Sequence, residues 1–332
     1  MAITHYHSTD TGSPGRSLSG STINRLRQIL RACLVDGYQG KPGAGWRVIH
    51  EHERGFSLQN GPGTGIINFV QNSSAENPDE VIQIYLLETV TSTSAAILSG
   101  DNLRSGTWYS GSNVTTRHTM NGYWILAANL SWIVWSVVAD ERTCIFTAGI
   151  GNAAPTAINA FGSMSLYFGE IKSDLGLSGA ATFVASGGQI TAPNVASQDG
   201  FTLSGGYTVL RNMKSGLFIP AGTTDCYCPE MSDGDRVLTT GQNIADTLVV
   251  PAEIRVNPLR AYSGSGGIVG KFRGCVADDT LRRYGIATLF RTLGLPVDMN
   301  SIGRMVDVGG ISLAPFANAK YQFMATTHPD FW

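Results

Sequence analysis

The sequence is poor in charge, and no dense run of lysine and arginine is present. Charged residues make up 14% of the 332 residues, against about 25% in an average soluble protein. The formal net charge is -2, so the basic surface that binds a phosphate backbone is missing. We therefore expect no nucleic-acid partner.

Long apolar runs and a targeting segment are also missing. The most apolar window, residues 123–139, is interrupted by polar residues and tryptophans, whereas a membrane-spanning helix needs about 20 mainly apolar residues. We therefore expect no membrane span. The start, "MAITHYHSTDTGSPG", has neither a basic region nor an apolar core, so no secretory signal is predicted. The 5 cysteines are scattered, which favours a reducing cytoplasm over a disulfide framework.

Glycine is present in excess, with 40 residues and no fixed period. Such a composition predicts many tight turns and hence many short strands. After Trp46, short runs of Val, Ile, Tyr, Trp and Thr alternate with Gly, Asn, Pro and Ser, which is the pattern of meander or sandwich strands. The sequence predicts a mainly β fold made of sandwich- or barrel-like β modules.

One segment predicts an amphipathic helix. Ser21 or Thr22 can cap it, and apolar residues from 23 to 34 recur at helical spacing. Arg25, Arg27 and Arg31 take much of the opposite side. The stretch "ACLVDGYQGKPGAGW", residues 32–46, then places Gly37 where helices often end, with Pro42 after it. We interpret this stretch as a helix stop and a link of fixed length, because nothing near its glycines supplies a ligand site.

These patterns divide the chain into four segments. Residues 1–45 are predicted to form an N-terminal arm and the helix, and residues 46–171 a first β module. Residues 172–205, rich in Ser, Ala, Gly and Thr, are predicted to be a linker or long loop, and residues 206–332 a second β module. The polar arm is expected to be ordered only where it lies on another surface.

The sequence contains three motifs that could bind a ligand. "GSGGIVGK", residues 264–271, lacks a required glycine and the Ser or Thr of a phosphate-binding loop, so a glycine-rich turn is the better interpretation. The pairs His5/His7 and His50/His52 have a spacing that can hold a metal. We expect surface histidines instead, and a metal only where a symmetry axis brings pairs together.

Catalytic patterns are weak. Cys226 and Cys228 have no second pair at zinc-site spacing. Paired carboxylates for sugar hydrolysis cannot be selected from 25 acidic residues, and the "VADERT" segment, residues 138–143, is equally explained as a charged turn. We therefore expect no enzyme activity and no cofactor.

Aromatic residues offer one further possibility. Trp108/Tyr109 and Trp132/Trp135 could stack on a sugar, although tryptophans among aliphatic residues more often belong to a core or an interface.

Several segments together resemble a family of tailed-bacteriophage virion proteins described as structural or tail-associated. The segments are "STDTGSP" at 8–14, "LRACLVDGYQGKPGAGW" at 30–46, "WSVVADERT" at 135–143, "LYFGEIKS" at 166–173 and "FRG" at 272–274, with Trp332 at the end. In that family a polar arm, a helix ending in Gly-Tyr and a Lys-containing link into Gly-Trp also precede strands. This chain departs from the pattern by its longer connector and in the region 180–260.

The resemblance implies a structural role in a virion, in the tail, baseplate or collar, and transfers no catalytic residue. We expect a homo-oligomer that docks on other virion proteins, located in the virion and, during assembly, in the host cytoplasm. Arg25, Arg27, Arg31, Trp108 and Tyr109 are the candidate contact residues. The alternatives are a tail module that binds a receptor or host surface glycan, a head decoration protein, and an enzyme that degrades the host envelope.

Overall fold

The computed structural model describes residues 2–16, 18–72, 81–94, 96, 98–105, 118–121, 133–150, 163–189, 208–218, 256–262, 267–277, 286–317 and 322–332. Within these residues the strands form three antiparallel sheets, and the longest helix is α1 (Thr22–Arg31). The predicted mainly β fold with one amphipathic helix is confirmed.

The sheets are named here by their position. The central sheet has the order β1 (Thr4–His7), β8 (Ile133–Ala139), β9 (Thr143–Ile150), β10 (Ser163–Glu170), β12 (Phe183–Gln189) and β13 (Thr208–Val209). The helix-side sheet has the order β2 (Arg47–His52), β3 (Gly55–Gln59), β4 (Ile66–Asn72), β5 (Val81–Leu87) and β6 (Arg104–Ser105), and β7 (His118–Asn121) also pairs with β5.

The C-terminal sheet has the order β11 (Lys172–Ser173), β15 (Ile268–Ala277), β18 (Gln322–Thr326), β17 (Ile311–Ala317) and β16 (Val306–Val308), and β14 (Asn257–Tyr262) also pairs with β15. Short helical segments are η1 (Ala32–Asp36), η3 (Gly179–Thr182), α2 (Ile286–Thr292), η6 (Met299–Ser301) and η7 (Pro329–Phe331). In the segment "DTLRRYGIATLF", residues 279–290, the described part from Ile286 onward is helical.

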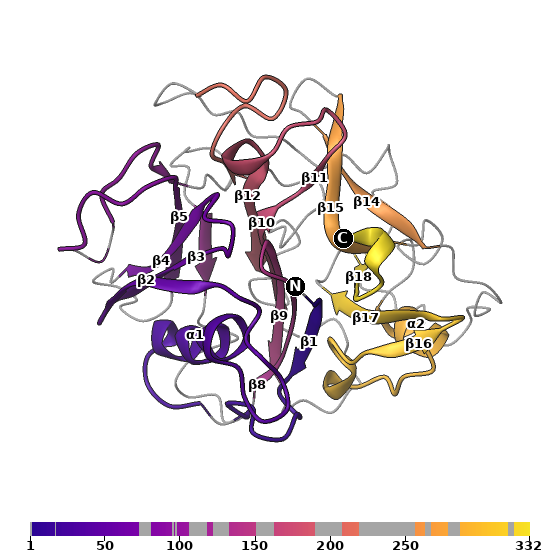
Figure 1. Ribbon diagram of the computed structural model, residues 1–332. Helices are drawn as coiled ribbons and strands as arrows, with labels where there is room; N and C mark the ends of the chain where they lie inside the picture. Colours follow the sequence, from indigo (N-terminus) through magenta and orange to yellow (C-terminus); the bar gives the residue numbers. More distant parts are fainter. Residues whose placement is uncertain are drawn as a thin grey trace, which may run out of the picture.

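The central sheet lies between the other two sheets (Figure 1). Its side chains alternate between two apolar clusters: Val137 packs with α1 and the helix-side sheet, whereas Val138 packs with the C-terminal sheet. The same alternation separates Phe168 from Tyr167 on β10. Because successive strand residues point to opposite faces, a strand covered on both faces is apolar at nearly every position. This explains why β8 is apolar throughout except at Ser136, which is buried and hydrogen-bonded.

Helix α1 covers the helix-side sheet with Ile23, Leu26, Ile29 and Leu30, all fully buried. The helix continues as one wider turn, η1, and ends at Gly37, whose φ of 73° is strained for other residues.

The link after η1 folds back on it. The Ala44 N–H donates to the Cys33 carbonyl and the Trp46 N–H to the Leu34 carbonyl. A Cβ at Gly43 would lie 2.2 Å from the Val35 carbonyl oxygen. The interpretation of residues 32–46 as a helix stop and a fixed link is confirmed by these contacts.

The N-terminal segment is ordered where it lies on another surface, as expected, but it does so as a strand of the central sheet and not as an irregular arm. Strand β1 pairs with β8, with Tyr6 opposite Val137, and Tyr6 is fully buried. A four-residue strand with one buried aromatic and hydrogen-bonded histidines needs no run of apolar residues, which is why hydropathy missed it.

The predicted segment boundaries are also wrong. The central sheet draws β1 from residues 1–45, β8 to β10 from 46–171, β12 from 172–205 and β13 from 206–332. The supposed linker therefore contains a full strand, β12, which pairs along β10 from Phe183 to Gln189. Its small residues suggested a loop, but backbone hydrogen bonds to β10 hold it in the sheet.

A contact between two sheets gives a first test. Gly65 lies before β4, and a Cβ there would lie 2.4 to 2.6 Å from three ring carbons of Phe183 on β12. The φ of Gly65 is not positive, so the effect of a methyl group is purely steric. We expect Gly65→Ala to lower the free energy of unfolding by about 1–3 kcal/mol, measured by urea denaturation.

The matched background is Phe183→Ala, which should itself cost about 3–5 kcal/mol because Phe183 is fully buried. In that background Gly65→Ala should cost little, since the clashing ring is gone. Equal costs of Gly65→Ala in the two backgrounds would contradict the close packing of these sheets.

Candidate functional site

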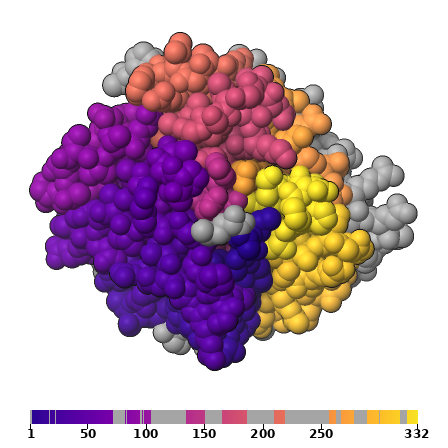
Figure 2. All heavy atoms as spheres, in the orientation of Figure 1, coloured from indigo at the N-terminus to yellow at the C-terminus, as the bar shows by residue number. Residues whose placement is uncertain are grey.

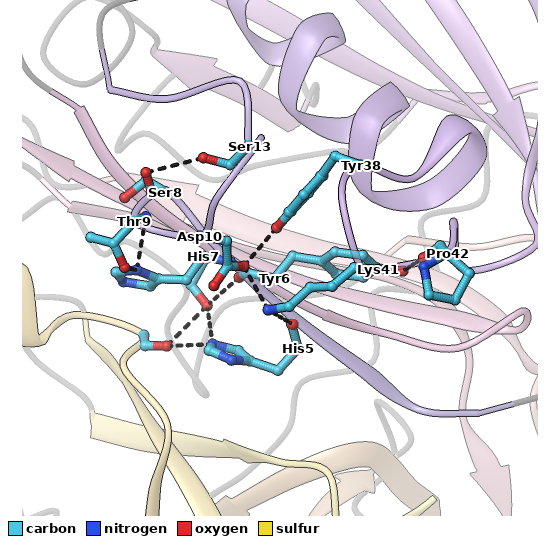
Figure 3. Close-up of polar contacts among 12 residues, drawn as sticks. His5, Tyr6, His7, Ser8, Thr9, Asp10, Ser13, Tyr38, Lys41 and Pro42 are labelled. Atoms are coloured by element: carbon cyan, nitrogen blue, oxygen red, sulfur yellow. Dashed lines mark hydrogen bonds and ion pairs between the residues drawn. The ribbon is translucent and has the colours of Figure 1, made fainter.

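Polar side chains gather at the N-terminal strand, in a cluster called here the N-terminal junction: His5, His7, Asp10, Tyr38 and Lys41 (Figure 3). Strand alternation turns Tyr6 into the core next to α1, and His5 and His7 to the other face. The junction therefore joins β1, the link after η1 and the turn of residues 301–304.

The carboxylate of Asp10 ties the link to β1. Its Oδ2 accepts hydrogen bonds from Lys41 Nζ at 2.6 Å and from the Tyr38 hydroxyl at 2.7 Å. The His7 backbone N–H donates to the same oxygen at 2.7 Å. Burial opposes ionisation, but these three hydrogen bonds outweigh it and hold the pKa of the Asp10 carboxyl below its usual value.

The two histidines bind the turn of residues 301–304. His5 Nε2 lies 2.8 Å from the Gly303 carbonyl oxygen and His7 Nε2 lies 3.2 Å from the Ile302 carbonyl oxygen. A carbonyl only accepts, so each Nε2 carries the hydrogen. The Thr9 N–H donates to Nδ1 of His7 at 3.3 Å, which requires that nitrogen to be unprotonated. The Thr9 hydroxyl lies 2.7 Å from the same Nδ1 and can also donate to it. All three contacts of the His7 ring thus fit the neutral form.

Burial sets the charge state of these rings. It lowers the pKa of His5 from 6.5 to about 4, against the opposing effect of the Gly303 hydrogen bond. Burial also lowers the pKa of His7, against the Ile302 hydrogen bond and the Asp10 charge. Desolvation disfavours the charged imidazolium, so both rings are neutral at pH 7.

Gly303 lets the turn approach β8. Its φ is 67°, and a Cβ there would lie 2.2 Å from Cβ of Ser136. The Ser136 hydroxyl also reaches the Tyr6 carbonyl at 3.1 Å and the Gly303 carbonyl at 3.0 Å. The first and last parts of the chain therefore meet at β8, and Figure 2 shows the indigo N-terminal and yellow C-terminal parts side by side at the surface.

A second polar cluster, the three-sheet junction, surrounds the turn between β8 and β9. Asp140 Oδ1 accepts from the backbone N–H groups of Arg142 and Thr143, both at 2.8 Å, and so closes the turn. Asp140 Oδ2 accepts from Arg273 of β15 at 2.6 Å. The Asp140 carbonyl accepts from Trp46 Nε1 at 2.9 Å. The "VADERT" segment is therefore the charged turn that closes β8.

Glu170 extends this junction to the helix-side sheet. Its Oε1 accepts from the Thr64 hydroxyl at 2.7 Å and from Asn60 Nδ2 at 3.3 Å. Its Oε2 accepts from Arg142 at 2.8 Å. Both buried carboxylates, Asp140 and Glu170, thus hold strands of different sheets together.

The predicted contact residues differ in exposure and in their hydrogen-bond partners. Arg25 is only 3% exposed and donates from Nε to the Gly20 carbonyl. Arg27 is half-buried and donates to the carbonyls of His52 and Gly55. The expectation of an open basic helix face is wrong for these two, because long arginine side chains fold along the apolar surface to reach carbonyl groups.

Arg31 is exposed and pairs with Asp36 at 2.8 Å and Glu51 at 2.9 Å. Trp108 and Tyr109 lie outside the described residues, so their role as contact residues stays a prediction.

The remaining motifs are placed as follows where the structure describes them. His7 is 4% exposed, so the expected surface position is wrong, whereas His50 and His52 lie half-buried on β2. Trp135 is fully buried and donates to the Gly15 carbonyl, as the core interpretation predicts. Residues 268–271 belong to β15, so no helix follows the glycine-rich segment.

Cysteines and metals give no site in the described part of the chain. Cys33, Cys144 and Cys275 are free and buried, and burial raises the pKa of each thiol. No group of three or more His, Cys, Asp or Glu among the described residues is placed to hold a metal ion. No described helix is long and apolar enough to cross a membrane. Cys226, Cys228 and Trp132 lie outside the described residues.

Large apolar side chains are exposed on two neighbouring loops. Leu217 is 68% exposed, Phe218 61% and Leu175 48%. The loops touch, since a Cβ at Gly216 would lie 3.6 Å from the Leu177 side chain. Arg211, which pairs with Glu88, lies 4.3 Å from the ring centre of Phe218. Hydropathy gives no sign that these residues share a surface, because Leu217 and Phe218 belong to a run of three apolar residues and Leu175 stands alone between Asp174 and Gly176.

No family model, no curated protein and no solved structure matches this chain. The two junctions described above are therefore the main structural observations that bear on function.

The three-sheet junction can be tested at Asp140. In Asp140→Asn, only one side of the amide can accept a hydrogen bond. Either the turn N–H groups or Arg273, whose side chain is 16% exposed, therefore loses its acceptor. We expect a loss of about 2–4 kcal/mol in the free energy of unfolding by urea denaturation. Glu141→Gln is the matched control in the same turn and should change stability by less than about 0.5 kcal/mol. Similar effects of the two variants would contradict the role given to Asp140.

The N-terminal junction can be tested at Asp10. Asp10→Asn removes the charge that Lys41 and Tyr38 share, and should cost about 1–3 kcal/mol by thermal or urea denaturation. Asp36→Asn is the control, because Asp36 is also paired with a basic residue but is 51% exposed, and exposed pairs contribute little. An Asp10 variant as stable as the Asp36 variant would contradict the proposed tie between β1 and the link.

Proposed function

We propose that this chain is a structural subunit of a bacteriophage virion, in the tail, baseplate or collar, which acts by associating with copies of itself and with other virion proteins. The observation that supports this proposal most directly is that buried and half-buried polar side chains form hydrogen bonds between different segments of the chain. His5, His7, Asp10, Asp140 and Glu170 all donate to or accept from groups of other segments, and so fasten the sheets together. A rigid body built this way suits an assembly subunit.

The composition supports the same proposal. Large exposed apolar side chains such as Leu217 and Phe218 are typical of contact surfaces. Few charges leave little electrostatic repulsion between neighbouring copies. The similarity to tail-associated virion proteins over residues 8–14 and 30–46 points the same way, and the 30–46 segment forms the helix end and link that hold Asp10.

A sugar-binding or enzymatic role has less support from the described residues. Trp135, one half of the possible stacking platform, is fully buried and cannot reach a sugar. The buried carboxylates Asp140 and Glu170 are held by arginines and backbone N–H groups, which leaves neither free to move a proton.

Purified virions test the proposal. Particles of the phage that encodes this chain are banded on a density gradient, and their proteins are quantified by mass spectrometry against a known structural protein of the same particle. We expect this chain at a fixed copy number per particle, and enriched in the tail fraction after heads and tails are separated. Abundant non-structural proteins of the infected cell serve as the carry-over control.

The purified protein gives a second measurement. Light scattering coupled to size exclusion should show an oligomer whose mass is a multiple of 35.4 kDa. A monomer at all concentrations, together with carry-over levels in virions, would overturn the proposal. Enrichment with the heads would instead favour a decoration protein.

A further inference from the structure

Strand β1 is held differently on its two sides. On one side its backbone pairs with β8 from Thr4 to His7. On the other side, side-chain hydrogen bonds from His5 and His7 reach the carbonyls of Gly303 and Ile302. No second strand pairs with β1 among the described residues. The contact of β1 with the turn of residues 301–304 therefore depends on two imidazole rings, both visible in Figure 3.

A positive charge on either ring would be repelled by neighbouring positive groups. Lys41 lies close to both rings, since its Nζ donates to the His5 carbonyl at 2.7 Å, and Arg16 acts on His7. The ring centres of His5 and His7 are 6.0 Å apart, so two imidazolium ions would also repel each other. The negative group facing them is Asp10, which already accepts from Lys41 and Tyr38.

Among the described residues, the other elements that contact the rings supply no charge. β8 contributes the Ser136 hydroxyl, 3.1 Å from His5 Nε2, and the 301–304 turn contributes backbone carbonyls. A proton on Nδ1 of His7 would displace the Thr9 N–H that now donates to it, and would leave the Thr9 hydroxyl oxygen, 2.7 Å away, as its acceptor. Protonation thus breaks the Thr9 N–H hydrogen bond and adds repulsion from the neighbouring positive charges.

The segment that follows β1 can act as a hinge. Gly12, Gly15 and Gly20 have φ values of 75°, 80° and 92°, a region open mainly to glycine. Glycine also adopts many other backbone conformations, so the chain can change direction at Gly12 and Gly15 while Ser19 and Gly20 stay bonded to Gln28 and Arg25 of α1.

We propose that His5 and His7 form an acid-sensitive latch: protonation of both rings releases β1 from the 301–304 turn and from β8, while β8, β9, β10 and β12 stay folded. The released segment is β1 with the residues up to the hinge, and its release leaves the edge of β8 unpaired.

The direction of the pH effect follows from proton binding. Burial lowers the pKa of His5 from 6.5 to about 4, so between these values the open form binds more protons than the closed form. Opening therefore increases as pH falls, and His5 alone raises the opening equilibrium constant about 20-fold between pH 7 and pH 5. The pKa of His7 is lowered by the same cause, so His7 adds to the effect.

Hydrogen exchange of the full chain tests the latch. Amide exchange is measured by mass spectrometry at pH 7 and pH 5 and corrected for the intrinsic rate at each pH. We expect peptides covering residues 4–8 to lose at least about 20-fold in protection, while those covering β9 and β10 keep theirs. An equal loss in all of these peptides would mean global unfolding and would overturn the proposal, as would no loss in residues 4–8.

The variant pair His5→Gln and His7→Gln, made together, tests the cause. Each glutamine amide can still donate to a carbonyl but cannot gain a proton near pH 5, so the loss of protection at pH 5 should disappear. The matched control is His50→Gln with His52→Gln, the second His-x-His pair, on β2 in another sheet. It should keep the wild-type loss.

Loss of the pH effect in the control pair, or its persistence in the latch pair, would contradict the assignment. If the latch pair does not fold, the wild-type protein still decides the question through NMR titration of its histidine ring protons. Two rings that titrate well below 6.5, together with opening of residues 4–8, support the latch. Ordinary titration of all histidines overturns it.

Discussion

The turn between β8 and β9 places one residue, Asp140, where all three sheets meet. Its carboxylate closes the turn of the central sheet and accepts from Arg273 of the C-terminal sheet, and its carbonyl accepts from Trp46 at the start of the helix-side sheet. A buried ion pair adds little net stability compared with apolar packing, but losing one partner is costly. The geometry of these hydrogen bonds therefore fixes how the layers sit on each other, which apolar contacts do not specify.

The parts of the fold that follow local patterns could be predicted from the sequence. The helical spacing from Ile23 to Leu34, the stop at Gly37 and the buried Trp135 all rest on residues close in sequence. The missed strands break those patterns. β1 has polar residues at three of its four positions. β17 contains Pro315, and proline has no backbone N–H to donate in a sheet. Pro315 lies beyond Leu313, the last residue of β17 that pairs with β16, so no carbonyl of β16 is left without a donor.

The two junctions could not be predicted, for a related reason. Glu170 is hydrogen-bonded to Thr64, 106 positions away in the sequence, and Asp140 to Arg273, 133 positions away. Neither pair has a spacing that a motif could describe, and a chain with 25 acidic residues offers many equivalent pairs. The arginines of α1 also differ from the prediction, because Arg25 and Arg27 donate to backbone carbonyls. Sequence periodicity predicts the side of the helix on which a residue lies, but not how far a long side chain reaches.

The contact between His5 and Gly303 joins residues 298 positions apart. A ribosome adds about 5–20 residues per second, so about 15–60 s pass between synthesis of the first strand and synthesis of the turn that receives its side chains. During that interval Tyr6 and two histidines have only part of their final surroundings. Long-range contacts of this kind also slow folding, since the loop must close before the contact contributes. β1 can therefore reach its full set of contacts only after the turn of residues 301–304 has been made.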